Sequence, residues 1–302
     1  MIAKKNFDVI IIGGSYAGLS AAMALGRSLR NVLIIDGGSP CNKQTPNSHN
    51  FITHDGSKPD EISRKAKEQV LKYGTVQFLE DFAVTGKRVE NKFFITTQSG
   101  KKFTSKKIIF ATGIKDIMPE IKGFSAAWGI SVIHCPYCHG YEFKGQKTGI
   151  LSNGDSAFHL ASLVNNLTDG LSILTNGKAT FSSEQLAKIE KNNINIIESK
   201  VLEVEHTNGK LENVVFENGE KISFSAVYAT LPFQQHSQIP VSLGCELTED
   251  GYIKVDFAQK TSVEGVFACG DNVTMMRSVS NAVYAGNVAG AVVNMELVQE
   301  EF

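Results

Sequence analysis

The sequence has no long hydrophobic run, no marked excess of charge of either sign, and only five cysteines among its 302 residues. The apolar run Val9–Ile12 is far shorter than the roughly 20 residues of a transmembrane helix, and it ends in glycines rather than in a cleavage site. A formal net charge of -1 excludes the strongly basic composition that favours nucleic acid or anionic membrane surfaces. Because an export signal is lacking and cysteines are few, we expect a cytoplasmic protein.

The length and composition indicate a globular protein with more than one core. Hydrophobic residues make up 42% of the chain and charged residues 20%, an ordinary balance for a globular protein. A chain of 302 residues exceeds the size of one comfortable core. We therefore expect two domains or one large α/β domain.

The chain begins with a βαβ pattern. Phe7–Ile12 is a short apolar run bounded by glycine, which is typical of a buried parallel strand. Tyr16–Leu29 is rich in alanine and leucine and predicts a helix, and Val32–Ile35 predicts the second strand. A turn-rich stretch over residues 37–58 precedes a helix that begins at Pro59. Irregular stretches of this length are unusual in compact domains and often line a site.

The same order of elements recurs in the middle of the chain. Lys147–Leu151 and Leu171–Leu174 are predicted strands on either side of a helix over Ser156–Asn165, and Asn208-Gly209 and Asn218-Gly219 mark hairpins. The pattern predicts an α/β fold with two Rossmann-like nucleotide-binding domains, each with a parallel sheet plus a β-meander, the second inserted in the first. The expected ranges are 1–116 with 240–302 for the first domain and 117–239 for the inserted one.

A glycine turn follows the first predicted strand. In Gly13-Gly14-Ser15-Tyr16-Ala17-Gly18, backbone N–H groups at the start of a helix can bind a pyrophosphate. Asp36 ends the second predicted strand, where a carboxylate can accept hydrogen bonds from a ribose. Ser15 replaces the middle glycine of G-x-G-x-x-G, and a tight turn without a ligand is the alternative. The expected dinucleotide-binding residues here are Gly13, Gly14, Ser15, Ala17, Gly18 and Asp36.

Two further strand ends carry residues suited to the same cofactor. Gly265–Asp271 reads as a strand that ends in Gly270 and Asp271, and this carboxylate can bond to a ribityl or pyrophosphate group. The alternative is a capped strand end. Together with Ala111-Thr112-Gly113, this segment resembles the distal FAD motif of flavoproteins with two dinucleotide domains.

The segment Cys135-Pro136-Tyr137-Cys138 carries the redox chemistry. Two cysteines separated by two residues can close a disulfide, and the start of a helix lowers the pKa of the first thiol. A second cysteine pair, which a tetrahedral metal site needs, is absent from the surrounding stretch. We therefore predict a redox-active pair and no metal site. A zinc half-site completed by His134 or His139 is the alternative.

Over essentially its whole length the chain resembles the low-molecular-weight thioredoxin reductases. The resemblance rests on the glycine turn, the Ala111-Thr112-Gly113 strand end, the Cys135–Cys138 segment and the C-terminal Gly265–Asp271 segment. The run His134–Glu142 is closer still to a subgroup of reductase-like enzymes related to dithiol oxidases. The resemblance implies an FAD-binding first domain and an inserted NAD(P)H-binding-like domain that carries the cysteine pair.

The resemblance also implies roles for individual residues. Cys138 would face the flavin, and Cys135 would exchange with the external sulfur. His139 stands where the reductases have an aspartate that assists proton transfer, and a histidine suits acid–base work near neutrality. A structural histidine at the end of the helix is the alternative.

Further expected flavin contacts are Asn50, in the long loop, and Arg277, Ser278 and Val279, where the last helix begins. The remaining cysteines, Cys41, Cys245 and Cys269, are expected to be buried small residues.

NADPH use stays open because the second glycine motif is degraded. Ser152 takes the place of the first glycine of the fingerprint, and Thr175–Lys178 takes the place of an arginine cluster that binds the extra phosphate of NADPH. A purely structural second Rossmann unit is the alternative.

The sequence therefore predicts an FAD-dependent thiol/disulfide oxidoreductase that passes electrons to a thioredoxin-like protein or a small disulfide. A homodimer is expected from the resemblance. A first alternative is a dithiol oxidase that uses oxygen, or a reductase fed by ferredoxin or another flavoprotein. A second is a non-catalytic flavoprotein redox sensor.

Overall fold

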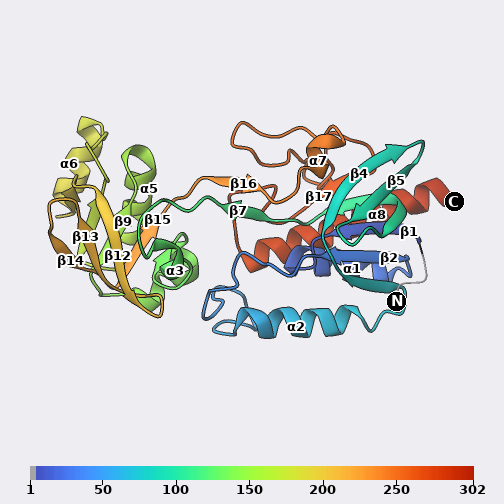
Figure 1. The fold of residues 1–302 in the computed structure, drawn as a ribbon, viewed down its shortest axis with the longest axis horizontal. Helices are drawn as coiled ribbons and strands as arrows, with labels where there is room; N and C mark the ends of the chain where they lie inside the picture. Colours follow the sequence, from blue (N-terminus) through green and yellow to red (C-terminus); the bar gives the residue numbers. More distant parts are fainter. Residues whose placement is uncertain (1–4) are drawn as a thin grey trace. The chain divides into compact units, whose positions relative to one another are not determined.

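The computed structural model describes residues 5–302, which form two compact units (Figure 1). The first unit comprises the chain up to Lys43 with Lys58–Lys115 and Phe233–Phe302, and the second comprises Gln44–Ser57 with Asp116–Pro232. The first four residues of the expected range 1–116 lie outside the described residues. The units differ from the expected ranges in three places, because residues 44–57 and Asp116 belong to the second unit and residues 233–239 to the first.

The first unit is built on a seven-stranded sheet in the order β3-β2-β1-β6-β5-β4, with β17 also paired to β6. Strands β1, β2, β3, β6 and β17 are parallel, and β4, β5 and β6 form an antiparallel meander. The strands are β1 (Asn6–Ile12), β2 (Val32–Asp36), β3 (Val76–Glu80), β4 (Ala83–Val89), β5 (Lys92–Thr97), β6 (Lys102–Phe110) and β17 (Val266–Ala268).

The helices of the first unit include a closely packed pair that joins the two ends of the chain. The helices are α1 (Tyr16–Arg27), α2 (Pro59–Val70), α7 (Ile239–Ser242) and α8 (Val279–Glu301). A side chain at Gly286 or Gly290 of α8 would meet the backbone of Ala17 or Ala21 in α1. The small residues of α8 therefore allow close helix packing, and Ser20 Oγ of α1 donates to the Val283 carbonyl at 2.7 Å.

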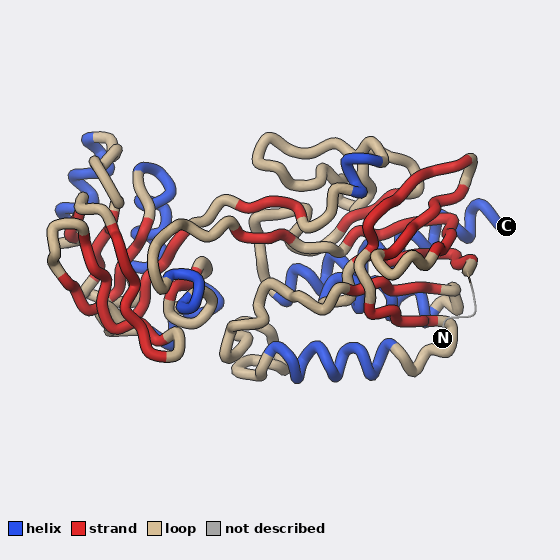
Figure 2. The backbone as a smooth tube through the Cα atoms, in the orientation of Figure 1, coloured by secondary structure: helices blue, strands red, loops and turns tan. Residues whose placement is uncertain are grey.

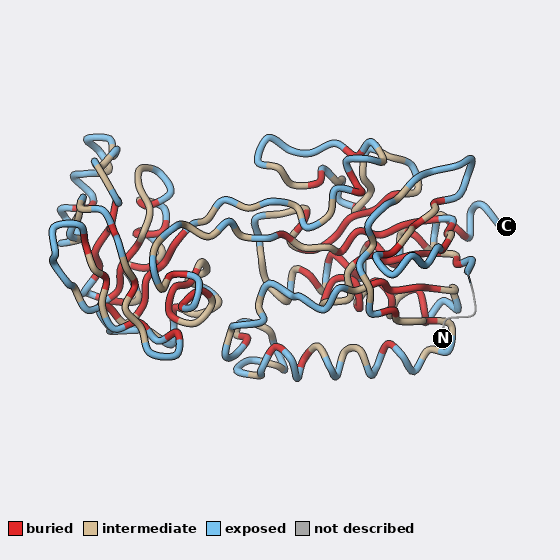
Figure 3. Tube along the Cα trace, viewed as in Figure 1, coloured by how far each residue is buried: buried red, intermediate tan, exposed pale blue. Residues whose placement is uncertain are grey.

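The core of the first unit is formed mainly by the side chains of its parallel strands, whose backbone is coloured as buried in Figure 3. Ile10, Leu33, Ile108 and Phe110 are fully buried, which matches the continuous apolar runs expected for strands covered on both faces. This packing holds the carboxyl ends of β1, β2, β6 and β17 at one edge, where the predicted nucleotide residues follow the strands.

The second unit repeats the design with a five-stranded parallel sheet and a separate antiparallel meander (Figure 2). The sheet order is β11-β10-β9-β15-β8, and β12, β13 and β14 form the meander. Asn208 and Gly209 join β12 to β13 with φ of 54° and 78°, as a type I′ hairpin requires. The strands are β8 (Val132–Ile133), β9 (Thr148–Leu151), β10 (Leu171–Leu174), β11 (Asn195–Ile197), β12 (Val201–Thr207), β13 (Lys210–Phe216), β14 (Lys221–Ser223) and β15 (Ala226–Ala229).

Short helices and one two-stranded sheet complete the structure. The helices of the second unit are α3 (Phe124–Ala127), α4 (Pro136–His139), the 3-10 helix η1 (Tyr141–Phe143), α5 (Gly154–Val164) and α6 (Ser183–Lys191). The connecting strands β7 (Ile114–Asp116) and β16 (Phe233–Gln235) pair with each other. Among the helices of residues 5–302, none combines the length and the apolar character needed to cross a bilayer. The two Rossmann-like sheets, each with a meander, confirm the predicted fold class.

Candidate functional site

The glycine turn after β1 is pressed against the end of β6. Gly13 has φ of 105°, a conformation that favours glycine, and a Cβ there would overlap the carbonyl oxygen of Ala111. The N–H of Gly14 donates to Asp36 Oδ1 at 2.8 Å. The structure therefore brings together the glycine turn, the Ala111-Thr112-Gly113 strand end and the Asp36 carboxylate.

Helix α1 begins at this junction, because a Cβ on Gly18 in its first turn would overlap the Gly13 carbonyl oxygen. Ser15 is its N-cap and has extended backbone, and Tyr16 and Ala17 follow as the first helical residues. The first backbone N–H groups of a helix have no acceptor within the helix, and they carry a partial positive charge. These groups are suited to an anionic pyrophosphate.

The end of β17 forms the third side of the same junction. A Cβ on Gly270 would lie 3.0 Å from the Cβ of Ala17, so Asp271 follows directly beside the start of α1. Asn272 is fully buried, and its Nδ2 donates to the Phe110 carbonyl at 2.9 Å and to Thr112 Oγ1 at 3.3 Å. Among the described residues the Asn272 Oδ1 atom has no hydrogen-bond donor. A buried acceptor beside the glycine turn fits a polar cofactor with donors of its own.

The last helix begins next to Asp271. Ser278 is the N-cap of α8, and its Oγ accepts a hydrogen bond from the Asn281 N–H at 3.1 Å. The Arg277 Nε atom lies 3.9 Å from Asp271 Oδ2, and Val279 is the first helical residue. The first unit thus gathers a helix terminus, backbone donors, an arginine and two carboxylates, a set suited to a flavin dinucleotide.

The two cysteines of the second unit form a disulfide. Cys135 and Cys138 are joined with their Cα atoms 5.3 Å apart, a usual separation for a disulfide. Cys135 is the N-cap of α4, as predicted, and its Sγ accepts from the Cys138 N–H at 3.2 Å. Tyr137, between them, is 69% exposed. The segment can therefore open and close by thiol–disulfide exchange.

A glycine directly after His139 lets this segment pack closely. A Cβ on Gly140 would overlap the Pro136 carbonyl oxygen and crowd Leu167, and it would lie 3.0 Å from the hydroxyl of Tyr228. Burial, with a smaller contribution from Glu142, raises the pKa of Tyr228 to about 12. Tyr228 therefore stays neutral near pH 7 and can act there only as a hydrogen-bonding group.

His139 contacts one imidazole ring and lies in the electric field of a carboxylate. Its ring meets the ring of His49 edge to face, with centroids 6.3 Å apart. Burial and then the charge of His49 lower the pKa of His139, while the charge of Glu142 opposes that change. His139 is therefore mostly neutral at pH 7 and able to accept a proton from a thiol.

Sequence reasoning missed His49, Glu142 and the buried Asn272. His49 lies in the irregular stretch 37–58, which carried only a general signal for a site, and its partners are distant in sequence. Asn50, an expected flavin contact, lies in the second unit, where its N–H donates to Asp55 Oδ1 at 2.8 Å. Its contact with flavin stays a prediction.

The other cysteines divide into two kinds. Cys245 and Cys269 are buried, as predicted, and burial raises the pKa of the Cys269 thiol to about 12. Cys41 was expected to be buried, and that prediction is wrong: Cys41 is exposed, with its Sγ 3.6 Å from Asp271 Oδ2. It lies in a surface loop because the stretch after β2 forms no helix or strand that would cover it.

The start of α5, which follows the second predicted glycine motif, is hydrogen-bonded by side chains of the chain itself. Asn153, the N-cap of α5, accepts from the N–H groups of Gly154 at 2.8 Å and Thr180 at 3.0 Å, and its Nδ2 donates to the Lys178 carbonyl at 2.8 Å. Asp155 in the first turn accepts from Gln185 Nε2 at 2.7 Å. A carboxylate in the first turn repels a pyrophosphate. The start of α5 therefore binds the chain's own polar groups, and use of NADPH stays open.

Residues 5–302 contain no group of three or more histidine, cysteine, aspartate or glutamate side chains placed to hold a metal ion.

A dinucleotide-binding unit joined to a second Rossmann-like unit with a Cys-x-x-Cys disulfide defines the class of nucleotide-dependent disulfide oxidoreductases. Residues 7–286 match the pyridine nucleotide-disulphide oxidoreductase family, and the chain belongs to this family. It is 31% identical to the thioredoxin reductase tcpT of Claviceps purpurea, over 99% of this chain and 97% of that protein.

Solved structures agree with this assignment. The putative thioredoxin reductase TrxB of Bacillus anthracis superposes with a TM-score of 0.93 at 31% identity, over 98% of this chain and 100% of that one. An oxidoreductase of Agrobacterium tumefaciens superposes with a TM-score of 0.91 at 33% identity, over 97% and 99% of the two chains. The protein is thus a thioredoxin reductase-like, FAD-dependent disulfide oxidoreductase.

Proposed function

We propose that this enzyme passes electrons between FAD and the Cys135–Cys138 pair, and exchanges them with a thioredoxin-like protein or a small-molecule disulfide. The observation that carries this proposal is the disulfide at the start of α4, with an exposed residue between its cysteines. Bound FAD supplies a centre that takes up or gives out two electrons. The names of the relatives, which are thioredoxin reductases, support the thioredoxin-like partner.

The residues of the first unit are assigned to FAD. The turn Gly13–Gly18 and the start of α1 bind the pyrophosphate, and Asp36 accepts hydrogen bonds from a ribose. Ala111, Thr112 and Gly113 form the base under the turn. Further contacts are assigned to Gly270, Asp271, Arg277, Ser278 and Val279.

The two cysteines divide the exchange between them. In the oxidising direction a substrate thiolate attacks Sγ of Cys135, the Cys135–Cys138 bond breaks, and Cys138 leaves as a thiolate. The second substrate thiolate then attacks the mixed disulfide and releases Cys135. The substrate dithiol becomes a disulfide and the cysteine pair becomes a dithiol. The reducing direction is the reverse of these steps, and Cys138 is assigned to the flavin side.

His139 is assigned to acid–base catalysis in this exchange. Because its pKa is lowered, its imidazole is neutral at pH 7 and accepts the proton that a reacting thiol must lose. In the reverse direction the protonated imidazole returns that proton to a leaving thiolate.

The Asn153 cap favours a second candidate function in which NADPH is not the electron donor. Asn153 already accepts a hydrogen bond from the N–H of Gly154 at the start of α5. The Asp155 carboxylate in the first turn would repel a pyrophosphate placed there. Electrons would then enter from a dithiol and leave to oxygen, as in a dithiol oxidase, or arrive from ferredoxin or another flavoprotein.

Anaerobic spectroscopy of the flavin tests these candidates. We expect dithiothreitol to bleach the flavin absorbance through Cys135 and Cys138, and NADPH to leave it unchanged. Bleaching by NADPH would instead support a thioredoxin reductase in the narrow sense. If dithiothreitol fails to bleach the flavin and Cys138→Ser leaves turnover unchanged with dithiols, disulfides and oxygen, the chain is a redox sensor rather than an enzyme of this kind.

We further propose a cytoplasmic homodimer. The dimer follows from the resemblance to thioredoxin reductases. On α8 the exposed residues Tyr284, Met295 and Val298 share one face of the helix, which supplies an apolar surface for a second copy. The reducing cytosol suits a close cysteine pair that works by exchange.

A further inference from the structure

The loop over residues 44–57 belongs to the second unit, together with the redox segment. Its two ends are joined by the Ser48 N–H, which donates to the Ser57 carbonyl at 2.8 Å, and by the Gly56 N–H, which donates to the Ser48 carbonyl at 2.9 Å. Ser48 is buried. His49 follows directly, so its backbone is fixed at the closed base of the loop rather than at a mobile tip.

His49 makes three contacts at this base. Its Nε2 lies 3.5 Å from Glu142 Oε1, and its Nδ1 lies 3.6 Å from Asp55 Oδ1. Its ring meets the ring of His139 at an interplanar angle of 90°. The His49 side chain is 19% exposed, whereas that of Asp55 is 68% exposed. His49 therefore lies between the redox segment and a carboxylate in water.

The charges around His139 oppose one another. The charge of His49 disfavours a proton on His139, and the Glu142 carboxylate favours one there. Tyr228, also near Glu142, stays neutral in this range. The acid–base state of His139 therefore depends on the charged groups that surround it.

We propose that His49 is a positioning residue of the redox centre: its ring packs against the ring of His139 and, together with Glu142, controls the acid–base state of His139, while its Nδ1 atom faces the exposed Asp55 carboxylate. When the dithiol becomes a disulfide, two electrons would pass to FAD and two protons leave the sulfurs, and the half-buried imidazole of His139 can accept one of these protons. This inference rests on the proposed acid–base role of His139.

Histidine NMR titration of the oxidised holoenzyme tests the coupling directly. In His49→Gln we expect the pKa of His139 to rise, because a neighbouring positive charge is removed. In Glu142→Gln we expect it to fall. The matched control is His54→Gln on the same loop, where the ring faces Phe51 at 5.8 Å, and it should leave the His139 titration unchanged. A His139 titration that is the same in His49→Gln and in the unsubstituted protein overturns the proposal.

The rate of iodoacetamide alkylation of the reduced cysteine pair, measured against pH, separates this proposal from the proposed function. We expect the His49→Gln profile to shift to higher pH with the His139 titration. If His139→Asn leaves the alkylation profile unchanged, the acid–base role of His139 is wrong, whereas the coupling between the two rings is still decided by the NMR titration. Circular dichroism of each variant checks that it is folded.

Discussion

Gly140 sets how closely the redox segment packs on the second unit. In Gly140→Ala the new methyl group would overlap the Pro136 carbonyl and crowd Leu167 and Tyr228. We expect a loss of about 1–3 kcal/mol in the free energy of unfolding, because backbone and buried side chains must shift. Urea unfolding measures this loss. Gly74→Ala is the control, since a Cβ there meets open space, and an equal loss in both variants would contradict the argument.

His139 should make stability depend on pH below neutrality. Because burial and His49 lower its pKa in the folded state, the unfolded chain binds the proton more tightly. This contribution to stability is complete above the unfolded pKa of about 6.5 and decreases as the pH falls through the lowered folded pKa. We expect His139→Gln to flatten the fall in unfolding free energy between about pH 7 and pH 5. A slope as steep in His139→Gln as in the unsubstituted protein would show that His139 titrates normally.

The five cysteines should differ in reactivity. In the folded, oxidised protein we expect iodoacetamide to label Cys41, because it is exposed, and to leave Cys245 and Cys269 unlabelled, because both are buried and burial raises their pKa. Cys135 and Cys138 should become labelled only after reduction. Peptide mass mapping before and after dithiothreitol checks the pattern. Labelling of Cys269 before unfolding would contradict the structure.

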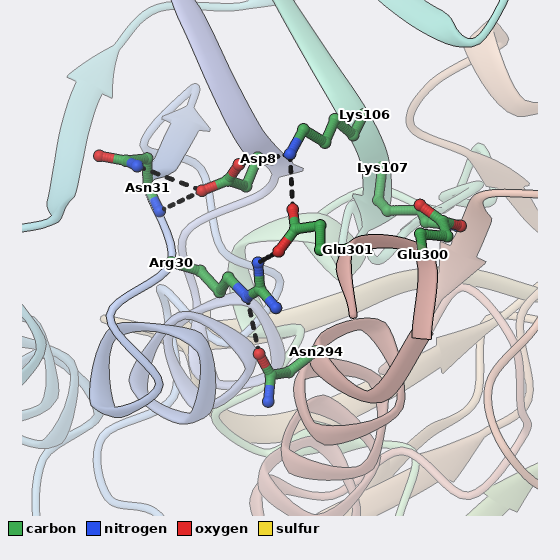
Figure 4. A network of polar contacts seen from close by, with 8 residues as sticks. All are labelled: Asp8, Arg30, Asn31, Lys106, Lys107, Asn294, Glu300 and Glu301. Atoms are coloured by element: carbon green, nitrogen blue, oxygen red, sulfur yellow. Dashed lines mark hydrogen bonds and ion pairs between the residues drawn. The ribbon is translucent and has the colours of Figure 1, made fainter. Parts of the chain in front are cut away.

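At the scale of elements, charged pairs fasten the end of α8 to the parallel sheet (Figure 4). The Lys107 side chain is 6% exposed, and its Nζ lies 2.9 Å from Glu296 Oε2 and 2.5 Å from Glu300 Oε1. The C-terminal end of a helix carries partial negative charge, so two glutamates there need a cation. Lys107 supplies it from β6.

We expect Lys107→Ala to cost about 2–4 kcal/mol of unfolding free energy, since it leaves the partly buried Glu296 with less compensation. The neighbouring Lys106 makes a control, because its pairs with Asp8 and Glu301 are more exposed. Lys106→Ala should cost less than about 1 kcal/mol. Denaturant unfolding of both variants measures the difference. Equal losses would show that burial of Lys107 adds nothing to this contact.

At the scale of the molecule, the proposed homodimer gives a further test. We expect the unsubstituted protein to run as a dimer in size-exclusion chromatography with light scattering, and Tyr284→Glu with Met295→Glu to shift it towards a monomer, because charge on the apolar face of α8 must be buried in the dimer. Leu202→Glu, an exposed residue of the second unit, is the control. A dimer that persists in the double variant places the interface elsewhere, and a monomeric unsubstituted protein contradicts the proposal.

The repeated fold was predictable because its signals are local. The apolar run of β1, the glycine turn and the Asn208-Gly209 hairpin each depend on residues close in sequence. The cysteine pair could be identified for the same reason, since its disulfide joins residues separated by three positions. The loop over residues 44–57 carried no such signal, because an irregular segment takes its position from contacts distant in the sequence.

The order of residues by itself therefore determined two nucleotide-type units, a glycine turn after the first strand and a Cys-x-x-Cys pair, since periodicity, glycine turns and short spacings act over a few residues. Tertiary structure alone decided that His49 meets His139 and Glu142, and that Asn153 closes the start of α5 with Thr180 and Lys178. Those contacts join segments tens of residues apart. Their charges and hydrogen bonds act only at the short distances that folding creates.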